Sequence, residues 1–104
     1  MQTIIFMGDS RERIRDFPDT ARYAMGKELL RVQQGLDPLN WKPMKTVGPG
    51  VREVRVHDGS HFRAFYVTNI GNALYVLHAF QKKTPQTSQK DIALGRARFK
   101  QIGE

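Results

Sequence analysis

Residues 51–80 contain three β-prone runs separated by two turn signals, and this pattern constrains the fold more than any other part of the chain. The expected order is Val51–Val56, the Asp-Gly turn His57–Ser60, Phe62–Thr68, the turn Asn69–Asn72, and Ala73–Phe80. The first run alternates, so Val54 and Val56 share one face of the strand while Glu53 and Arg55 share the other. Because short turns join antiparallel neighbours, the three runs predict an antiparallel meander.

The segments around this meander are predicted to form one more strand and three helices. The expected strand is Thr3–Met7, followed by helices over about Ser10–Asp16 and Pro18–Gln34, and then by a loop over 36–50 with three prolines and two glycines. Asp9 or Ser10 is expected to cap the first helix, where Asp9-x-x-Glu12 resembles a capping box, and Ser88-x-x-Asp91 is a capping box at the start of the last helix. Gly26 lies inside the second helix, and close packing is one reason for a glycine there.

The sequence therefore predicts a single α+β domain over residues 1–104, in the order β-α-α-β-β-β-α. Two N-terminal helices should pack on one face of a small antiparallel sheet, and a C-terminal helix completes the domain. The first strand should join the same sheet. Ala73–Phe80 is the most apolar run and is expected at the sheet centre, while the second face should carry polar and cationic groups.

Charge indicates the kind of partner. Lys and Arg total 17 against 10 Asp and Glu, a formal net charge of +7, and most of the excess lies in residues 51–104. Such a balance favours a polyanion as partner. The absence of cysteine excludes disulfides and thiolate metal sites. No apolar run is long enough to span a bilayer, and MQTIIFMGDS lacks the features of a signal peptide, so a cytoplasmic protein without a membrane partner is expected.

Four cations are expected to meet where the meander strands end. Lys82 and Lys83 follow the last strand, and Arg55 and Arg63 project from its neighbours. Guanidinium and ammonium groups bind phosphate and stabilise the anionic phosphorane that forms when a 2′-hydroxyl of RNA attacks the adjacent phosphodiester. No HExxH, Walker or GxSxG motif occurs, so no metal or cofactor is expected.

These residues also form part of a family resemblance. Asp9-Ser10-Arg11, Phe17-Pro18, Gly26, WKPMKTVGPGVREVRV (41–56), Phe62-Arg63-Ala64-x-Tyr66 and YVLHAFQKKTPQT (75–87) followed by Asp91-Ile92 resemble the phage-derived Gp49-like proteins. That family belongs to the HigB branch of the RelE-type toxins. The resemblance covers nearly the whole chain and implies a compact RelE-type fold. It also implies a type II toxin that cuts mRNA on the ribosome without a metal, contacts ribosomal RNA, and is silenced by a cognate helix-turn-helix antitoxin of the HigA type.

The resemblance gives each cation a role. Arg63 would contact the scissile phosphate, Arg55 would hold backbone phosphate or share in proton transfer, and Lys83 would stabilise the transition state. The expected RNA-binding residues are Lys82, Arg52, His61 and Tyr66. Some relatives carry a tyrosine or histidine near the C-terminus as acid–base group, whereas Ile92–Glu104 contains neither.

Several of these residues also have a simpler, purely structural interpretation. His78 alternates with apolar residues and is expected to be a hydrogen-bonded core histidine. Arg55 and Glu53 share a strand face, and a surface ion pair is their simplest relation. Lys82 and Lys83 could also protect a sheet edge, and Tyr66 suits a core. The alternative function is a non-catalytic module of phage origin that binds RNA or protein.

Overall fold

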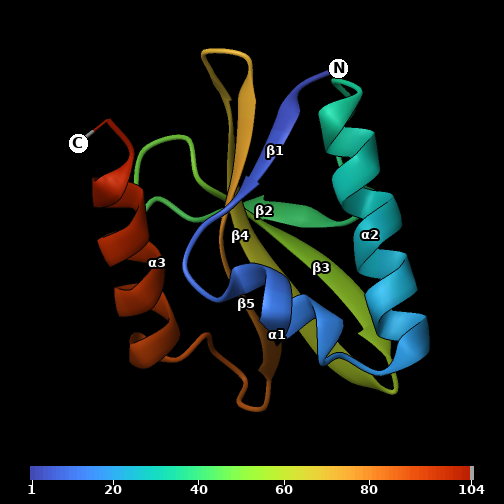
Figure 1. The fold of residues 1–104 in the computed structure, drawn as a ribbon. Helices are drawn as coiled ribbons and strands as arrows, with labels where there is room; N and C mark the ends of the chain where they lie inside the picture. The colour runs from blue at the N-terminus through green and yellow to red at the C-terminus, as the bar shows by residue number, and fades with distance from the viewer. Residues whose placement is uncertain (104) are drawn as a thin grey trace.

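The computed structural model describes residues 1–103, which form three helices and one five-stranded sheet (Figure 1). The elements are β1 (Thr3–Phe6), α1 (Ser10–Arg15), α2 (Asp19–Gln33), β2 (Trp41–Pro43), β3 (Arg52–Asp58), β4 (Ser60–Ile70), β5 (Ala73–Lys82) and α3 (Gln89–Gln101). The α+β class, the order of the predicted elements and the position of the meander are confirmed.

The strand β2 is an addition, because it lies inside the predicted loop over 36–50. Its three residues pair antiparallel with β3, from Trp41 opposite Val54 to Pro43 opposite Arg52. A proline is tolerated there because β2 is an edge strand, where one side needs no ladder hydrogen bond. The prolines and glycines of this segment therefore led to the prediction of a loop where the structure has a short strand.

The sheet order is β1-β5-β4-β3-β2, with β1 parallel to β5 and the other neighbours antiparallel. The first strand joins the sheet as predicted. The prediction that Ala73–Phe80 is the centre is wrong, because β4 is the third of the five strands. The strand β5 is nevertheless internal, and pairing with β1 and β4 explains why its residues are so apolar.

Local sequence signals were considered at three helix ends, and the structure follows two of them. At the end of α2, Gly35 has φ 85°, and its N–H donates to Val32 O at 3.0 Å, which is a left-handed C-terminal cap. Ser88 caps α3, because its side chain accepts a 3.1 Å hydrogen bond from the N–H of Asp91. The capping box expected at Asp9 is wrong: Asp9 makes no side-chain cap and pairs instead with Arg13 and Arg98, at 2.9 and 2.8 Å.

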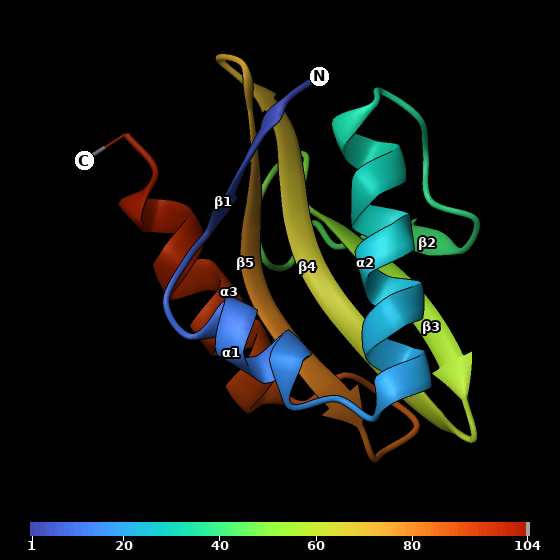
Figure 2. The same ribbon diagram turned by 45° about the vertical axis from the view of Figure 1, so that its right-hand side comes forward.

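Both faces of the sheet are covered, as Figure 2 shows with α2 on one side and α3 on the other. The first face packs against α1 and α2 in an apolar cluster that includes Met25, Val54 and Leu74. The second face carries another apolar cluster under α3, formed by residues such as Phe65 and Leu77. The expectation of a polar and cationic second face is therefore wrong for the part under α3, since that helix needs an apolar surface to pack against.

No helix among residues 1–103 is long and apolar enough to cross a membrane.

Candidate functional site

Three of the predicted cations lie on the same face of the sheet as α3. Arg55 of β3 is directly opposite Arg63 of β4, and Lys82 at the end of β5 is opposite His61, two residues before Arg63. Because alternate residues of a strand share a face, Arg55, Arg63 and Lys82 project to the same side. We call Arg55, Arg63 and Lys82 the cation cluster.

A buried carboxylate organises this cluster. Glu53 of β3 is 0% exposed, and its Oε1 lies 3.3 Å from Arg55 Nε and 3.4 Å from Arg63 Nε. Its other oxygen, Oε2, accepts a hydrogen bond from Thr87 Oγ1 at 3.1 Å. One carboxylate therefore holds two guanidinium groups side by side and ties them to the loop after β5.

The two arginines differ in how deeply they are buried. The side chain of Arg55 is 28% exposed, whereas that of Arg63 is 8% exposed. Arg63 Nη1 donates to Phe62 O at 3.3 Å, and Arg63 Nε makes no hydrogen bond within the described residues although it lies in ion-pair range of Glu53. Burial lowers the pKa of Arg63, which Glu53 opposes and Arg55 reinforces.

Arg63 was expected to contact the scissile phosphate, and a surface ion pair was the simplest relation expected of Arg55 and Glu53. The structure instead shows a fully buried Glu53 carboxylate that pairs with the buried Arg63 and with the partly exposed Arg55. The physical reason is that α3 and the segment before it cover this part of the sheet, so that a charge on β4 needs a buried counter-charge.

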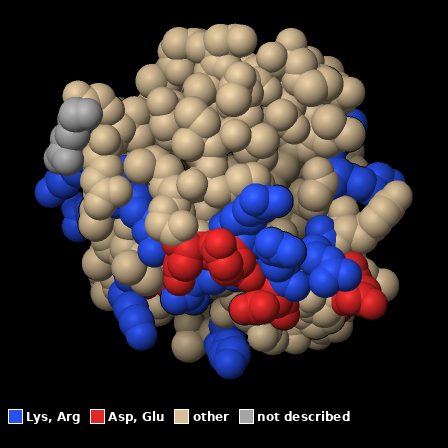
Figure 3. Space-filling model, viewed as in Figure 1, with Lys and Arg blue, Asp and Glu red and all other residues tan. Residues whose placement is uncertain are grey.

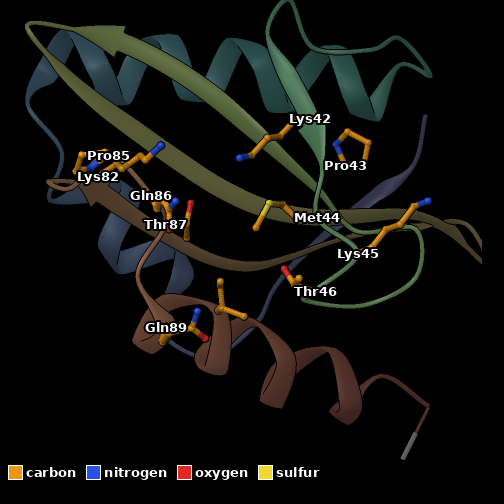
Figure 4. Close-up of a pocket in the computed structure, with 11 residues that line it drawn as sticks. Lys42, Pro43, Met44, Lys45, Thr46, Lys82, Pro85, Gln86, Thr87 and Gln89 are labelled. Carbon is orange, nitrogen blue, oxygen red and sulfur yellow. The ribbon is translucent and has the colours of Figure 1, made fainter.

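Lys82 reaches an open groove beside the cluster. The groove, about 530 Å³ in volume, is bounded by β2 and the turn after it, by the loop after β5, and by the start of α3. Figure 4 shows Lys42 of β2 and Lys82 pointing toward one another across it. Burial lowers the pKa of Lys82, and the positive charges of Arg63, Lys42 and Arg55 add to this while Glu53 opposes it.

Lys83 lies outside β5 and is exposed. With Lys82, Phe80, Ser88 and Asp91 it lines a smaller hollow between the end of β5 and the start of α3. The two lysines are therefore adjacent, but only Lys82 belongs to the strand face of the cation cluster.

Two predicted RNA-binding residues lie elsewhere. Arg52 and Tyr66 are opposite each other, and Tyr66 belongs to the core on the α2 face of the sheet. Arg52 lies over the ring of Trp41, 4.0 Å from its centroid, and pairs with Asp37 at 2.8 Å. Arg52 and Tyr66 therefore lie on the other face of the sheet from Arg63, because their strand positions have the opposite parity.

The three histidines have different settings. His78 is 0% exposed, its Nε2 lies 2.7 Å from Asp91 Oδ1, and its Nδ1 lies 3.4 Å from Arg98 Nη1, so the interpretation as a bonded core histidine is confirmed. Burial lowers its pKa, and Asp91 opposes that shift. His57 and His61 are exposed at the β3–β4 hairpin.

The charges on the side with α1 have a different pattern. Figure 3 shows positive and negative side chains intermingled over α1 and the start of α2, with a largely uncharged surface above them. The ion pairs Asp9–Arg13 and Asp19–Arg22 account for part of this pattern. Such a surface offers a polyanion less attraction than the cation cluster and the groove do.

Sequence reasoning missed Glu53 as an anchor, Thr87 as its partner and Lys42 as a groove residue. The parity of β3 already placed Glu53 beside Arg55 and Arg63, so a requirement for a buried counter-charge could have identified it. Nothing local pointed to Thr87, which reaches Glu53 from 34 residues away. Within residues 1–103 no three His, Asp or Glu side chains are grouped to hold a metal ion.

Known proteins are similar to this chain in sequence and in fold. A model of the family described as phage-derived protein Gp49-like (DUF891) matches residues 12–100. The solved structure of the isolated E. coli RelE toxin is similar with a TM-score of 0.64 and 16% identity, over 93% of this chain and 99% of that one. The toxin–antitoxin complex RelBE2 from Mycobacterium tuberculosis gives a TM-score of 0.49 and 18% identity, over 78% of this chain and 98% of that one. No curated protein sequence matches.

Proposed function

Because the chain belongs to the phage-derived Gp49-like family and has the fold of a RelE toxin, we propose that it is the toxin of a type II toxin–antitoxin module. Its activity would be ribosome-dependent cleavage of mRNA, which stops translation. The protein would act in the bacterial cytoplasm without a metal, and a cognate helix-turn-helix antitoxin of the HigA type would silence it.

The observation that carries this proposal is the cation cluster on Glu53. Three positive side chains and one buried carboxylate leave a net positive charge at the edge of an open groove. A phosphodiester placed there would gain charge-assisted hydrogen bonds, and these would strengthen as the phosphorane gains negative charge. Arg55 and Lys82 are the accessible members and would touch the phosphate, with Lys83 and His61 beside them.

Arg63 is buried and would act through its positive charge. Its guanidinium adds positive charge next to Arg55 and contributes to the lowered pKa of Lys82. A lysine whose pKa is lowered gives up a proton more readily, which suits it to protonate a leaving oxygen.

The test is induced expression in bacteria with measurement of growth, of amino-acid incorporation and of new mRNA 5′ ends. The unchanged protein should arrest growth and create new ends inside translated messages. Arg55→Ala should lower cleavage by about 10²–10³-fold, as removal of one transition-state donor does in other enzymes. The matched control is Arg96→Ala, which removes the same charge from an exposed position on α3 and should leave cleavage unchanged.

Arrest without new mRNA ends, or equal losses in the two variants, would reject the endonuclease. Arg63→Ala is a less specific test, because the Arg63 side chain is only 8% exposed and its removal would empty space inside the fold, whereas that of Arg55 is 28% exposed.

A second candidate is a module that binds RNA without cutting it. The burial of Arg63 in an ion pair favours this alternative, since a paired guanidinium offers fewer free donors to a phosphate. It predicts salt-sensitive binding of single-stranded RNA, measured by fluorescence anisotropy, with no cleavage on translating ribosomes.

A further inference from the structure

Two histidines form a pair at the β3–β4 hairpin, next to the cation cluster. His57 of β3 and His61 of β4 are directly opposite each other across the hairpin, with ring centroids 4.6 Å apart and ring planes at 33°. They occupy alternate positions with Arg55 and Arg63, so they lie on the same face of the sheet. Both are exposed. The sequence predicted His61 as an RNA-binding residue, but it did not predict that His57 lies against it.

Two members of the cation cluster lie next to His61. Lys82 is its direct neighbour on β5, and Arg63 is two residues along its own strand. Directly opposite side chains in a sheet have Cβ atoms about 4.5–5.5 Å apart, so one phosphodiester can touch His61 and Lys82 together. On β3 the nearest charged groups are Arg55 and Asp58, and the carboxylate of Asp58 already accepts a hydrogen bond from Thr20.

This setting favours the neutral form of the imidazole by lowering its pKa. Partial desolvation lowers the pKa of His61 below its ordinary value of 6.5, and the charges of His57, Arg63, Lys82 and Arg55 lower it further. A histidine with a lowered pKa is unprotonated at pH 7 and is ready to accept a proton.

We propose that His61 is the general base that activates the 2′-hydroxyl of the RNA, an assignment that rests on the proposed function. The 2′-oxygen forms a bond to phosphorus while its proton passes to the imidazole of His61. The bond from phosphorus to the 5′-oxygen breaks, and that oxygen takes a proton from the Lys82 ammonium. The products are a 2′,3′-cyclic phosphate and a 5′-hydroxyl, and solvent restores both protonation states.

His57 is a positioning residue in this scheme. Its ring lies against that of His61, so it fixes the ring orientation and disfavours a second positive charge. The remaining histidine, His78, cannot take either role because it is buried, bonded to Asp91 and near Arg98.

The experiment measures cleavage of a defined mRNA on purified, programmed ribosomes under single-turnover conditions over a range of about pH 5.5 to 8.5, which brackets the titration of a histidine. The unchanged protein should cleave fastest above the pKa of His61 and lose rate as pH falls through it. His61→Gln should slow cleavage about 10²–10⁴-fold and lose this acid limb, with half-saturating protein concentration little changed. Added imidazole should restore part of the rate of His61→Ala.

His57→Gln should move the midpoint of the acid limb to higher pH, because one of the charges that lower the pKa of His61 is gone. Lys100→Gln, an exposed position at the end of α3, controls for the loss of any basic group and should not change the profile.

The outcomes separate the two proposals. If the unchanged protein cleaves and His61→Gln cleaves equally fast, or keeps the acid limb, the role of His61 is overturned while the endonuclease stands. If His61→Gln only weakens binding, His61 holds phosphate and is not the base. If the unchanged protein does not cleave at any pH, the endonuclease and the role of His61 are rejected together.

Discussion

Glu53 is fully buried in β3, and three side chains share its carboxylate: Arg55, Arg63 and Thr87. A buried charge of this kind is tolerated only while its partners remain, since the cost of its desolvation is offset by their attraction. The arrangement fixes where the arginines lie, and it makes the candidate site dependent on one acid that touches no phosphate.

We predict that Glu53→Gln destabilises the fold by about 3–5 kcal/mol, because it leaves the buried Arg63 without its counter-charge. The matched control is Asp37→Asn, which breaks the exposed pair with Arg52 and should cost less than about 1 kcal/mol. Urea unfolding at neutral pH measures both. Equal costs would show that burial does not set the strength of the Glu53 pairs.

At the scale of the elements, two glycines in helices have opposite surroundings. A Cβ at Gly95 of α3 would lie 2.8 Å from Phe65 Cδ2 and 3.0 Å from Val47 Cγ1. A Cβ at Gly26 of α2 would meet nothing within 4 Å, so the close packing considered for Gly26 is wrong. Close packing therefore requires glycine at position 95, where the missing side chain lets α3 approach the sheet.

Gly95→Ala should therefore cost about 1–3 kcal/mol through overpacking. Gly26→Ala should stabilise the protein by about 0.5–1 kcal/mol, because alanine loses less backbone entropy in a helix. Thermal unfolding of the two variants provides the measurement. A gain at Gly95 would mean that α3 can shift away from Phe65 at little cost.

At the scale of the whole molecule, one sheet is shared by two apolar clusters, so that separation of α3 exposes the same strands that hold α1 and α2. His78 lies at this junction, with its ring inside the second face and its hydrogen bond to Asp91 of α3. Its protonation should therefore affect the stability of the complete fold.

Because the pKa of His78 is lowered in the folded protein, the unfolded chain binds more protons as pH falls below 6.5. Stability should fall from pH 6.5 down to the folded pKa of His78, by at most about 1.4 kcal/mol per pH unit for this one group. His78→Gln should flatten most of this slope, and His61→Gln should remove a smaller part. Urea midpoints between about pH 7 and pH 5 measure the effect, and an unchanged slope in His78→Gln would contradict it.

Local signals in the sequence determined most of the elements. The Asp-Gly turn, the cap at Ser88 and the stop at Gly35 act through neighbouring residues, so their effects can be predicted without knowing the fold. The strand β2 was not predicted, because it forms by pairing with β3 and its own proline-containing sequence does not favour a strand. The cap at Asp9 failed because Arg98, distant in the chain, and Arg13 compete for its carboxylate.

The candidate site was predicted in part. Alternation placed Arg55 and Arg63 on one face from the sequence alone, since the side-chain period of a strand is a local property. Only the tertiary structure decided that α3 covers this face, that Glu53 is buried between the arginines, and that His57 meets His61 beside Lys82. Burial and cross-strand neighbours depend on which distant segments pack together, and these two quantities set the charge and the protonation of the groups at the site.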